Sequence, residues 1–418
     1  MTLKTEQAFQ PIIIQSGQNA YGMARSFYEA YGVRSLVLEP SRKKRNIQTF
    51  ILGGSQAIAT KNSRIVDFQQ VDYLDDPNYF VHALTGVAKQ YKNKKLLLFV
   101  CDCYYVELVI KNKQALENYF ILPYIDESLM NQIQTKENFY KKCDLYNLKY
   151  PRTMVLTNKN YETTAISLAY PIIIKASNSA EYKNCSFLGK QKIFLVHNEE
   201  DQKRIVKSIF SSTYNDHLIL QEYIPGDDTT IRVLYVYVGK DKKVKLMCLG
   251  NTLIEDPSPH HIGNSLAVVT DYDKQLMDKI RFFLEDIGYT GYANFDMKLD
   301  VRDGEYKLFE INLRTGTSSY YVTASGHNLM KYVVDDYVFG ENLELTYVQA
   351  EHLWSLIPKK VLFKCIVNKP LKAEAKRLIK QGKYTDALYF KEDMNIKRWS
   401  MLKAYNLYLK IKFKKYYK

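Results

Sequence analysis

The chain has 418 residues and a formal net charge of +14, with 46% apolar and 25% charged residues. This composition excludes a disordered chain, a collagen-like repeat and a disulfide scaffold, and the length predicts two or three domains. The charge is uneven, because residues 351–418 hold 18 Lys and Arg against 5 Asp and Glu, whereas residues 1–350 hold 41 against 40. We therefore expect a nearly neutral body and a basic C-terminal region with separate roles.

The cysteines and the apolar runs indicate a compartment. None of the six cysteines forms a Cys-x-x-Cys pair, which argues against a zinc ribbon or a thioredoxin-like site, and their spread fits reduced thiols. The first twenty residues lack a secretory signal pattern, and no uncharged apolar run is long enough to span a bilayer. We expect a cytoplasmic protein, at most held peripherally at the inner face of a membrane.

Strand and helix signals alternate near the N-terminus. A helix is predicted over 21–32, closed by Gly32. Short apolar strands are predicted at 11–17, 34–40 and 94–102. Such strands interleaved with helices are typical of a parallel sheet covered on both faces. This pattern predicts a Rossmann-like α/β domain over residues 1–126.

The first turn of this domain allows two interpretations. Gly17, Asn19 and Gly22 resemble a loose nucleotide-binding turn. A lone glycine-rich turn is also common as a plain structural turn, so both interpretations stay open.

The pattern changes after a helical stretch at 127–150. Strands with short connections are predicted at 170–177, 191–198, 217–228 and 229–239, then a helix at 273–288 and strands at 292–300 and 305–312. Grouped strands and helices of this kind predict an α+β domain, which we place at 127–345. We expect residues 346–418 to form a basic C-terminal extension.

The segment NFDMKLDVRDGEYKLFEIN at 294–312 predicts a hairpin that turns at Asp-Gly. A two-residue loop would place Asp296 opposite Ile311. A three-residue loop at 302–304, with its glycine in the left-handed conformation, would place Asp296 opposite Glu310 and Asn294 opposite Asn312. Glu310 and Asn312 share a face in both registers, because strand side chains alternate.

In the second register Asp296, Glu310 and Asn312 form one cluster of oxygen atoms. Two carboxylates directly opposite each other repel unless a cation neutralises them. Carboxylate and amide oxygens suit Mg²⁺. The alternative is a solvated hairpin face with scattered acids.

Two further segments precede the hairpin in the chain. Lys175 ends the apolar strand PIIIK, where a lysine needs an anionic partner or a route to water. The linker QEYIPGDD at 221–228 offers backbone groups for the edge of a purine and a carboxylate for ribose hydroxyls. Each feature alone is compatible with a structural role, but their order along the chain is informative.

With these elements the sequence resembles the ATP-grasp superfamily of carboxylate–amine ligases over about residues 125–345. The resemblance rests on TKENFYKKC, PIIIK, EYIPG and FEIN, in this order. Within the superfamily, segment 295–328 is similar to the ligases that attach D-aspartate during peptidoglycan synthesis. The resemblance implies an ATP-grasp fold that follows an N-terminal α/β domain.

The resemblance also implies roles for individual residues. Lys136 and Lys175 would contact ATP phosphates, and Asp228 would contact the ribose. Asp296, Glu310 and Asn312 would bind two Mg²⁺ ions, with Mn²⁺ as an alternative. The adenine-binding linker would comprise Gln221, Glu222, Tyr223 and Ile224.

Other positions match the superfamily less closely. The phosphate-covering loop is often rich in glycine, but here segment 177–190 has glycine only at 189. Ser177, Asn178 and Ser179 would then supply donors to phosphate. Arg232 would face the phosphates, and Arg314 would face the reacting acyl phosphate. Substrate contacts are expected from Arg314, Ser318 and Ser319.

The implied reaction forms an acyl phosphate from a substrate carboxylate and ATP, and an amine then attacks this acyl phosphate. Because such an intermediate must be shielded from water, we expect segment 153–222 to form a lid over the nucleotide. The expected substrate is D-aspartate, and the expected acceptor is a lysine amine on an anionic, nucleotide-linked peptide precursor. A ligase of the same fold for another amino acid or metabolite is the first alternative.

The second alternative is a non-catalytic module that binds a membrane or nucleic acid through the basic region. Segment 404–418 interleaves lysines with aromatic and aliphatic residues. Such a segment can be a solvated helix, lie on anionic lipid or stack on single-stranded bases. We expect nucleic acid to be the least favoured of these partners.

Overall fold

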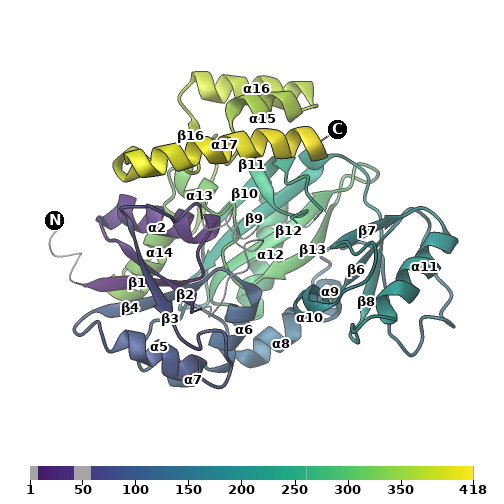
Figure 1. Cartoon of the computed structure of the whole chain (residues 1–418), viewed down its shortest axis with the longest axis horizontal. Helices are drawn as coiled ribbons and strands as arrows, with labels where there is room; N and C mark the ends of the chain where they lie inside the picture. Colours follow the sequence, from purple (N-terminus) through teal and green to yellow (C-terminus); the bar gives the residue numbers. More distant parts are fainter. Residues whose placement is uncertain (1–7, 42–57, 260, 418) are drawn as a thin grey trace.

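The structure is a computed structural model, and it describes residues 8–41, 58–259 and 261–417 (Figure 1). These residues form three β-sheets with helices packed on their faces. The mixed α/β and α+β architecture agrees with the prediction from sequence.

The N-terminal sheet is parallel, with strand order β3-β2-β1-β4. Its strands are β1 (Phe9–Ile14), β2 (Ser35–Pro40), β3 (Val66–Val71) and β4 (Lys95–Val100). Its helices are α2 (Gln18–Tyr31), α5 (Phe80–Ala88), α6 (Cys103–Lys111) and α7 (Lys113–Leu116). Gly32 ends α2 with a φ of 68°, a left-handed conformation that glycine adopts without strain. The predicted strands and helix are confirmed.

The helical stretch before the second sheet is two helices, α8 (Glu127–Ile133) and α9 (Lys136–Leu145). The helix is interrupted between them. The Thr135 side chain accepts a hydrogen bond from the backbone N–H of Asn138 and so caps a new helix. This cap puts Lys136 at the first position of α9.

The second sheet is antiparallel, with order β5-β8-β6-β7. Its strands are β5 (Thr153–Leu156), β6 (Ile172–Ala176), β7 (Ile193–Val196) and β8 (Leu218–Glu222), and its helices are α10 (Ser179–Asn184) and α11 (Glu199–Phe210). Buried residues of these elements form a core of their own. This small unit stands beside the main body in Figure 1 and occupies the segment that we expected to form a lid.

The largest sheet has eight strands in the order β13-β12-β9-β10-β11-β15-β16, with β14 paired to β10. The strands are β9 (Ile231–Val238), β10 (Val244–Glu255), β11 (Ser265–Asp271), β12 (Gly291–Leu299), β13 (Tyr306–Asn312), β14 (Thr346–Tyr347), β15 (Leu353–Ser355) and β16 (Tyr384–Asp386). A short η1 (Asp228–Thr230) precedes β9, and η2 (Asp335–Phe339) follows the last helix before β14.

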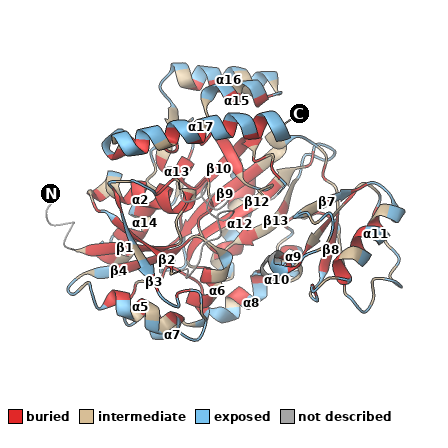
Figure 2. Ribbon diagram, viewed as in Figure 1, coloured by how far each residue is buried: buried red, intermediate tan, exposed pale blue. Residues whose placement is uncertain are grey.

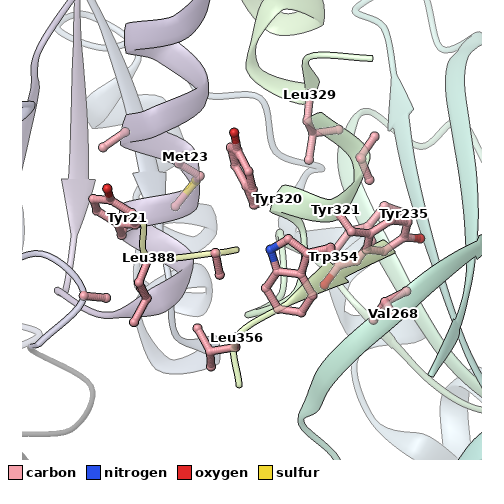
Figure 3. Close-up of a cluster of buried hydrophobic side chains, with 14 of the residues drawn as sticks. Tyr21, Met23, Tyr235, Val268, Tyr320, Tyr321, Leu329, Trp354, Leu356 and Leu388 are labelled. Atoms are coloured by element: carbon pink, nitrogen blue, oxygen red, sulfur yellow. The ribbon is translucent and has the colours of Figure 1, made fainter. Parts of the chain in front are cut away.

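Alternate residues of β9 enter two different cores. Leu234 and Val236 pack with α12 (Lys274–Asp286) on one face of the sheet. Tyr235 and Tyr237 pack on the other face with α2, α13 (Tyr320–Ala324) and α14 (Leu329–Val334). Figure 3 shows this second core, in which Tyr235 and Tyr321 lie near Trp354. The N-terminal sheet is therefore joined to the central sheet through a shared core.

The basic C-terminal region is part of the same body. It contains β15 and β16 of the central sheet, α15 (Lys359–Cys365), α16 (Lys369–Lys380), η3 (Lys391–Asp393) and α17 (Ile396–Tyr416). Helix α17 buries Leu402, Tyr405, Leu409 and Phe413 in the core that α2 also enters. The sequence had suggested an extension separate from the body, because the long-range contacts that bury these side chains leave no local signal.

Among the described residues, no helix combines the length and the apolar character needed to cross a membrane.

Candidate functional site

The site begins at the hairpin of β12 and β13. Asp296 pairs with Glu310, and Asn294 pairs with Asn312, so the second predicted register is confirmed. The turn itself differs from the prediction, since Leu299 pairs with Tyr306 and the backbone N–H of Asp300 donates to the carbonyl of Glu305. The loop is therefore one residue longer than expected.

A bulge at Phe309 compensates for the longer loop. The register shifts between the pairs Asp296–Glu310 and Met297–Leu308, which leaves Phe309 without a partner across the hairpin. Its carbonyl instead accepts a 2.8 Å hydrogen bond from the hydroxyl of Tyr140 on α9. The bulge turns Glu310 to the face that carries Asp296.

Asp296 is held by two amides on the same face. Its carboxylate accepts hydrogen bonds from the side-chain amides of Asn312 at 2.9 Å and Asn294 at 3.3 Å. Burial, with the nearby charge of Glu310, raises the pKa of Asp296 above its usual range. The protein thus concentrates negative charge here without fully balancing it.

Glu310 forms an ion pair with a lysine of the site. Its Oε2 atom lies 2.8 Å from Nζ of Lys136, at the start of α9. This lysine lowers the pKa of Glu310. Burial disfavours the charge on Lys136, but Glu310 more than offsets that effect and raises the pKa of the lysine. The two side chains form a charged pair between α9 and the hairpin.

Lys175 lies on β6, across from the hairpin. Its Nζ atom is 5.5 Å from the centre of the Phe309 ring, on the bulge. Burial, followed by repulsion from Lys136, lowers the pKa of Lys175 to about 7. A polyanion placed between the two lysines would restore the charge of Lys175.

Arg314 follows β13 and reaches the N-terminal domain. It donates to the carbonyl of Thr315 at 2.9 Å and to Sγ of Cys103 at 3.4 Å. Cys103 opens α6 and also lies 3.9 Å from Oδ1 of Asn312. Within the described part of the chain, the buried Nε of Arg314 has no hydrogen-bond partner. The guanidinium therefore lies beside the carboxylate cluster, and its Nε–H group can still donate a hydrogen bond.

The predicted adenine linker leaves the end of β8 and passes the same hairpin. Gln221 is buried and donates to the hydroxyls of Tyr140 and Thr153 at 2.7 and 2.8 Å. Glu222 accepts from the backbone N–H of Arg152 at 2.9 Å and from Arg302 at 3.2 Å. The backbone N–H groups of Glu222 and Tyr223 also donate, to the carbonyls of Arg152 at 2.9 Å and Pro171 at 3.4 Å. Side-chain and backbone bonds together fix the linker to its surroundings.

The rest of the linker lies along β12. Tyr223 faces Nζ of Lys298 at 5.5 Å from the ring centre, and Ile224 is buried. The carboxylate of Asp228 accepts a 3.0 Å hydrogen bond from the backbone N–H of Glu255, and burial raises the pKa of Asp228. Lys298 shares a strand face with Asp296, so the linker and the carboxylate cluster lie along one side of the hairpin.

The predicted phosphate loop is partly occupied by internal bonds. The Ser177 hydroxyl donates to both carboxylate oxygens of Glu137 at 3.1 Å, next to Lys136. The Asn178 side chain accepts from the backbone N–H of Glu181. Ser179 opens α10, and the prediction for its side chain lies outside what the structure describes.

Three residues that were predicted to contact ligands are instead bonded to other protein groups, and the first of them is Arg232. Arg232 donates to Asp271 at 2.7 Å and to Asn251 at 2.9 Å. It neighbours Val233, the partner of Asp296, so strand alternation directs it to the opposite face of the sheet. This placement does not support the expectation that Arg232 faces the phosphates.

Ser318 and Ser319 are both buried. The Ser318 hydroxyl lies 3.2 Å from the hydroxyl of Tyr235, and Ser319 donates to the side chain of Asn19 at 3.3 Å. These contacts give the two serines a part in holding the loop after β13.

The oxygen atoms around Asp296 fit Mg²⁺. The donors are hard carboxylate and amide oxygens, and the buried Oδ1 of Asn294 has no hydrogen-bond partner among the described residues. Burial and the nearby charge of Glu310 raise the pKa of Asp296, and a cation beside it would favour the charged form. Asp296, Glu310 and Asn312 are the residues that would hold such an ion.

Several residues of the site were not among the predicted site residues. Asn294 and Lys298 could have been found, because they alternate with Asp296 along one strand. Cys103 and Asn19 come from another domain, and only the fold brings them to the loop after β13.

The chain was compared with known protein families and curated proteins. Residues 133–318 match the ATP-grasp domain family. The D-aspartate ligase of Enterococcus faecium (strain Aus0004) is 39% identical over 425 residues, which cover 98% of this chain and 97% of the relative. An N-terminal section of a carbamoyl phosphate synthase large chain from Methanopyrus kandleri is 23% identical over 37% of this chain and 26% of its own length.

Solved structures share the fold at low sequence identity. An N5-carboxyaminoimidazole ribonucleotide synthetase in complex with ADP superposes with a TM-score of 0.57 at 16% identity, covering 96% of this chain and 97% of that chain. An L-amino acid ligase from Bacillus licheniformis gives 0.55 at 14% identity, covering 81% and 76%. The expected ATP-grasp fold is confirmed.

Proposed function

The chain belongs to the D-aspartate ligase family of ATP-grasp enzymes, and from that premise we propose that it activates D-aspartate with ATP and joins it to an amine. The acceptor in this proposal is a lysine side chain on an anionic, nucleotide-linked peptidoglycan precursor. The observation that carries the proposal is the identity of 39% over nearly the full length of both chains.

The reaction has two balanced steps. A β-carboxylate oxygen of D-aspartate attacks the γ-phosphorus of ATP, and the bond from that phosphorus to the bridging oxygen breaks, which releases ADP. The acceptor amine then attacks the acyl carbon, the carbon–oxygen bond to phosphate breaks, and the amine loses a proton. The products are an amide, ADP and phosphate.

The first step brings two anions together, so fixed positive charge is required. The proposal assigns Lys136 and Lys175 to the ATP phosphates and Arg314 to the acyl phosphate. Their positions around Glu310 and Asn312 support these roles. Both lysines are held by the fold before substrate arrives, so little reorganisation is needed during the reaction.

Mg²⁺, when bound, would supply the remaining counter-charge on the phosphates. We propose two ions, held by Asp296, Glu310 and Asn312, with Mn²⁺ as an alternative. The cluster of donor atoms on one hairpin face supports this assignment. The ribose would be contacted by Asp228, and the adenine by the linker 221–224.

The test is phosphate release with ATP, Mg²⁺ and single amino acids from a panel of D- and L-isomers. The expected result is release that depends on D-aspartate and rises when a lysine-containing, nucleotide-linked peptide is added. Release with another amino acid alone would refute D-aspartate as the substrate and leave a ligase of the same fold. Absence of release with every amino acid and acceptor would refute the ligase activity itself.

A further inference from the structure

Helix α17 has an apolar inner face and a second, exposed face that the fold leaves open. The inner face is fixed by buried side chains and by an ion pair of 2.5 Å between Lys412 and Asp256. Figure 2 shows exposed residues along this helix, which crosses the upper part of the view below α15 and α16. The orientation of the outer face is therefore set by the core.

Large apolar side chains stand on this outer face. Ile396, Leu407 and Ile411 keep 86%, 57% and 61% of their surface exposed, and Trp399 keeps 50%. At 100° per residue, Ile396, Lys403, Leu407, Ile411 and Lys414 fall within one narrow stripe. Exposed apolar side chains that gather on one face of a helix can mark a surface that meets a partner or a membrane.

The charge on this face has one sign. The exposed lysines of α17 are Lys397, Lys403, Lys410, Lys414 and Lys415. The sequence contains no acidic residue after Asp393. A partner must therefore accept inserted aliphatic groups and carry negative charge beside them.

An anionic lipid surface meets both conditions. Lysine stems can lie along the interface with their ammonium groups at the headgroups, while isoleucine and leucine enter the acyl boundary. A second copy of the chain would oppose lysines to lysines across a twofold axis. Single-stranded nucleic acid would favour a face of aromatic side chains for stacking, and here the most exposed groups are aliphatic.

We propose that the outer face of α17, defined by Ile396, Trp399, Lys403, Leu407, Lys410, Ile411 and Lys414, docks the enzyme on anionic membranes. The helix lies flat on the lipid, and the body of the protein stays in water. This docking is independent of the ligase chemistry, since none of these residues belongs to the site described above.

The test is co-sedimentation of the full-length enzyme with vesicles of phosphatidylcholine, with and without phosphatidylglycerol. We expect binding to the anionic vesicles that weakens as salt is raised. The double variant Leu407→Ser with Lys410→Glu should lose affinity for these vesicles by about tenfold or more. Its D-aspartate-dependent phosphate release with water-soluble substrates should equal that of the wild type.

A matched control changes one exposed apolar residue and one lysine on α12, at the other face of the sheet. The variant Phe282→Ser with Lys279→Glu should bind vesicles like the wild type. Equal binding by the α17 variant and the wild type would overturn the proposal, as would equal binding to neutral and anionic vesicles. Absence of vesicle binding by the wild type would also overturn it. If the wild type then self-associated or bound single-stranded DNA, and the α17 variant did not, the face would have a different partner.

Discussion

At the scale of single residues, Asp296 and Glu310 carry the same charge but have different environments. Glu310 is neutralised by Lys136, whereas the hydrogen bonds to Asp296 from the described residues come from the side-chain amides of Asn294 and Asn312. An added cation would therefore stabilise Asp296 most, which is the physical reason to place a metal there.

Replacing either carboxylate tests this role. Asp296→Asn and Glu310→Gln should each lower the turnover number by about a hundredfold or more, because the phosphates lose part of their counter-charge. Asp303→Asn, on the exposed turn of the same hairpin, is the control and should retain activity. Near-normal Mg²⁺-dependent turnover in either site variant would disprove the metal assignment.

The lowered pKa of Lys175 gives a second prediction at this scale. The free enzyme has this pKa at about 7, so Lys175 is largely neutral at pH 8 and gains charge as the pH falls through 7. ATP phosphates beside it raise the pKa, so binding of ATP at pH 8 should take up a proton. Calorimetric titration in buffers of different ionisation enthalpy measures this uptake.

The matching variant is Lys175→Met, which cannot take up that proton. We expect it to bind ATP more weakly and without the uptake seen for the wild type at pH 8. Unchanged proton uptake in the variant would show that another group is responsible.

At the scale of elements, the hairpin shows what the sequence could and could not predict. Strand alternation placed Glu310 and Asn312 on one face without any structure. The register depended on the bulge at Phe309, which is fixed by Tyr140 on a distant helix. A local pattern contains no trace of that contact, so two registers had to remain open.

Helix α2 is the second informative element. From the sequence, its first turn could be a nucleotide-binding turn or a plain structural turn. In the structure, Asn19 has a structural role. Asn19 donates to the carbonyl of Thr315 at 2.7 Å and accepts from the hydroxyls of Thr315 and Ser319 at 3.0 and 3.3 Å. All three residues are buried, so α2 positions the loop that follows Arg314.

Asn19→Ala should therefore lower the turnover number more than it changes KM for ATP, because the loop beside Arg314 loses its anchor. The free energy of unfolding should fall by about 1–3 kcal/mol, since buried polar groups lose their partners. Asn328→Ala is the control, because Asn328 donates to the carbonyl of Ser26 further along α2. It should destabilise the fold without a comparable effect on turnover. Equal turnover in both variants would argue against a positioning role.

At the scale of the whole molecule, the C-terminal region ties the domains together. Arg398 of α17 is fully buried and pairs with Asp393 at 3.0 Å. Asp393 also accepts from the hydroxyls of Tyr21 on α2 and Ser63, at 2.8 and 2.9 Å. The sequence pattern does not single out these charges, because the partners in two of the contacts lie more than 300 residues away.

This network predicts a large effect of a small change. Asp393→Asn leaves Arg398 buried beside a neutral group, so the free energy of unfolding should fall by about 3–5 kcal/mol. Denaturant unfolding measures the loss. Glu351→Gln removes an exposed carboxylate that pairs with Arg377 and Lys383 and should leave stability nearly unchanged. Similar small effects of both changes would mean that the network contributes little.

The central claim is that the carboxylate of D-aspartate becomes an acyl phosphate. The most direct measurement uses D-aspartate labelled with ¹⁸O in its β-carboxylate, with mass analysis of the phosphate released during ligation. Because the carboxylate oxygen that attacks ATP leaves with the phosphate, the account predicts that each phosphate carries a single labelled oxygen. Phosphate without label, formed together with the amide product, would contradict it.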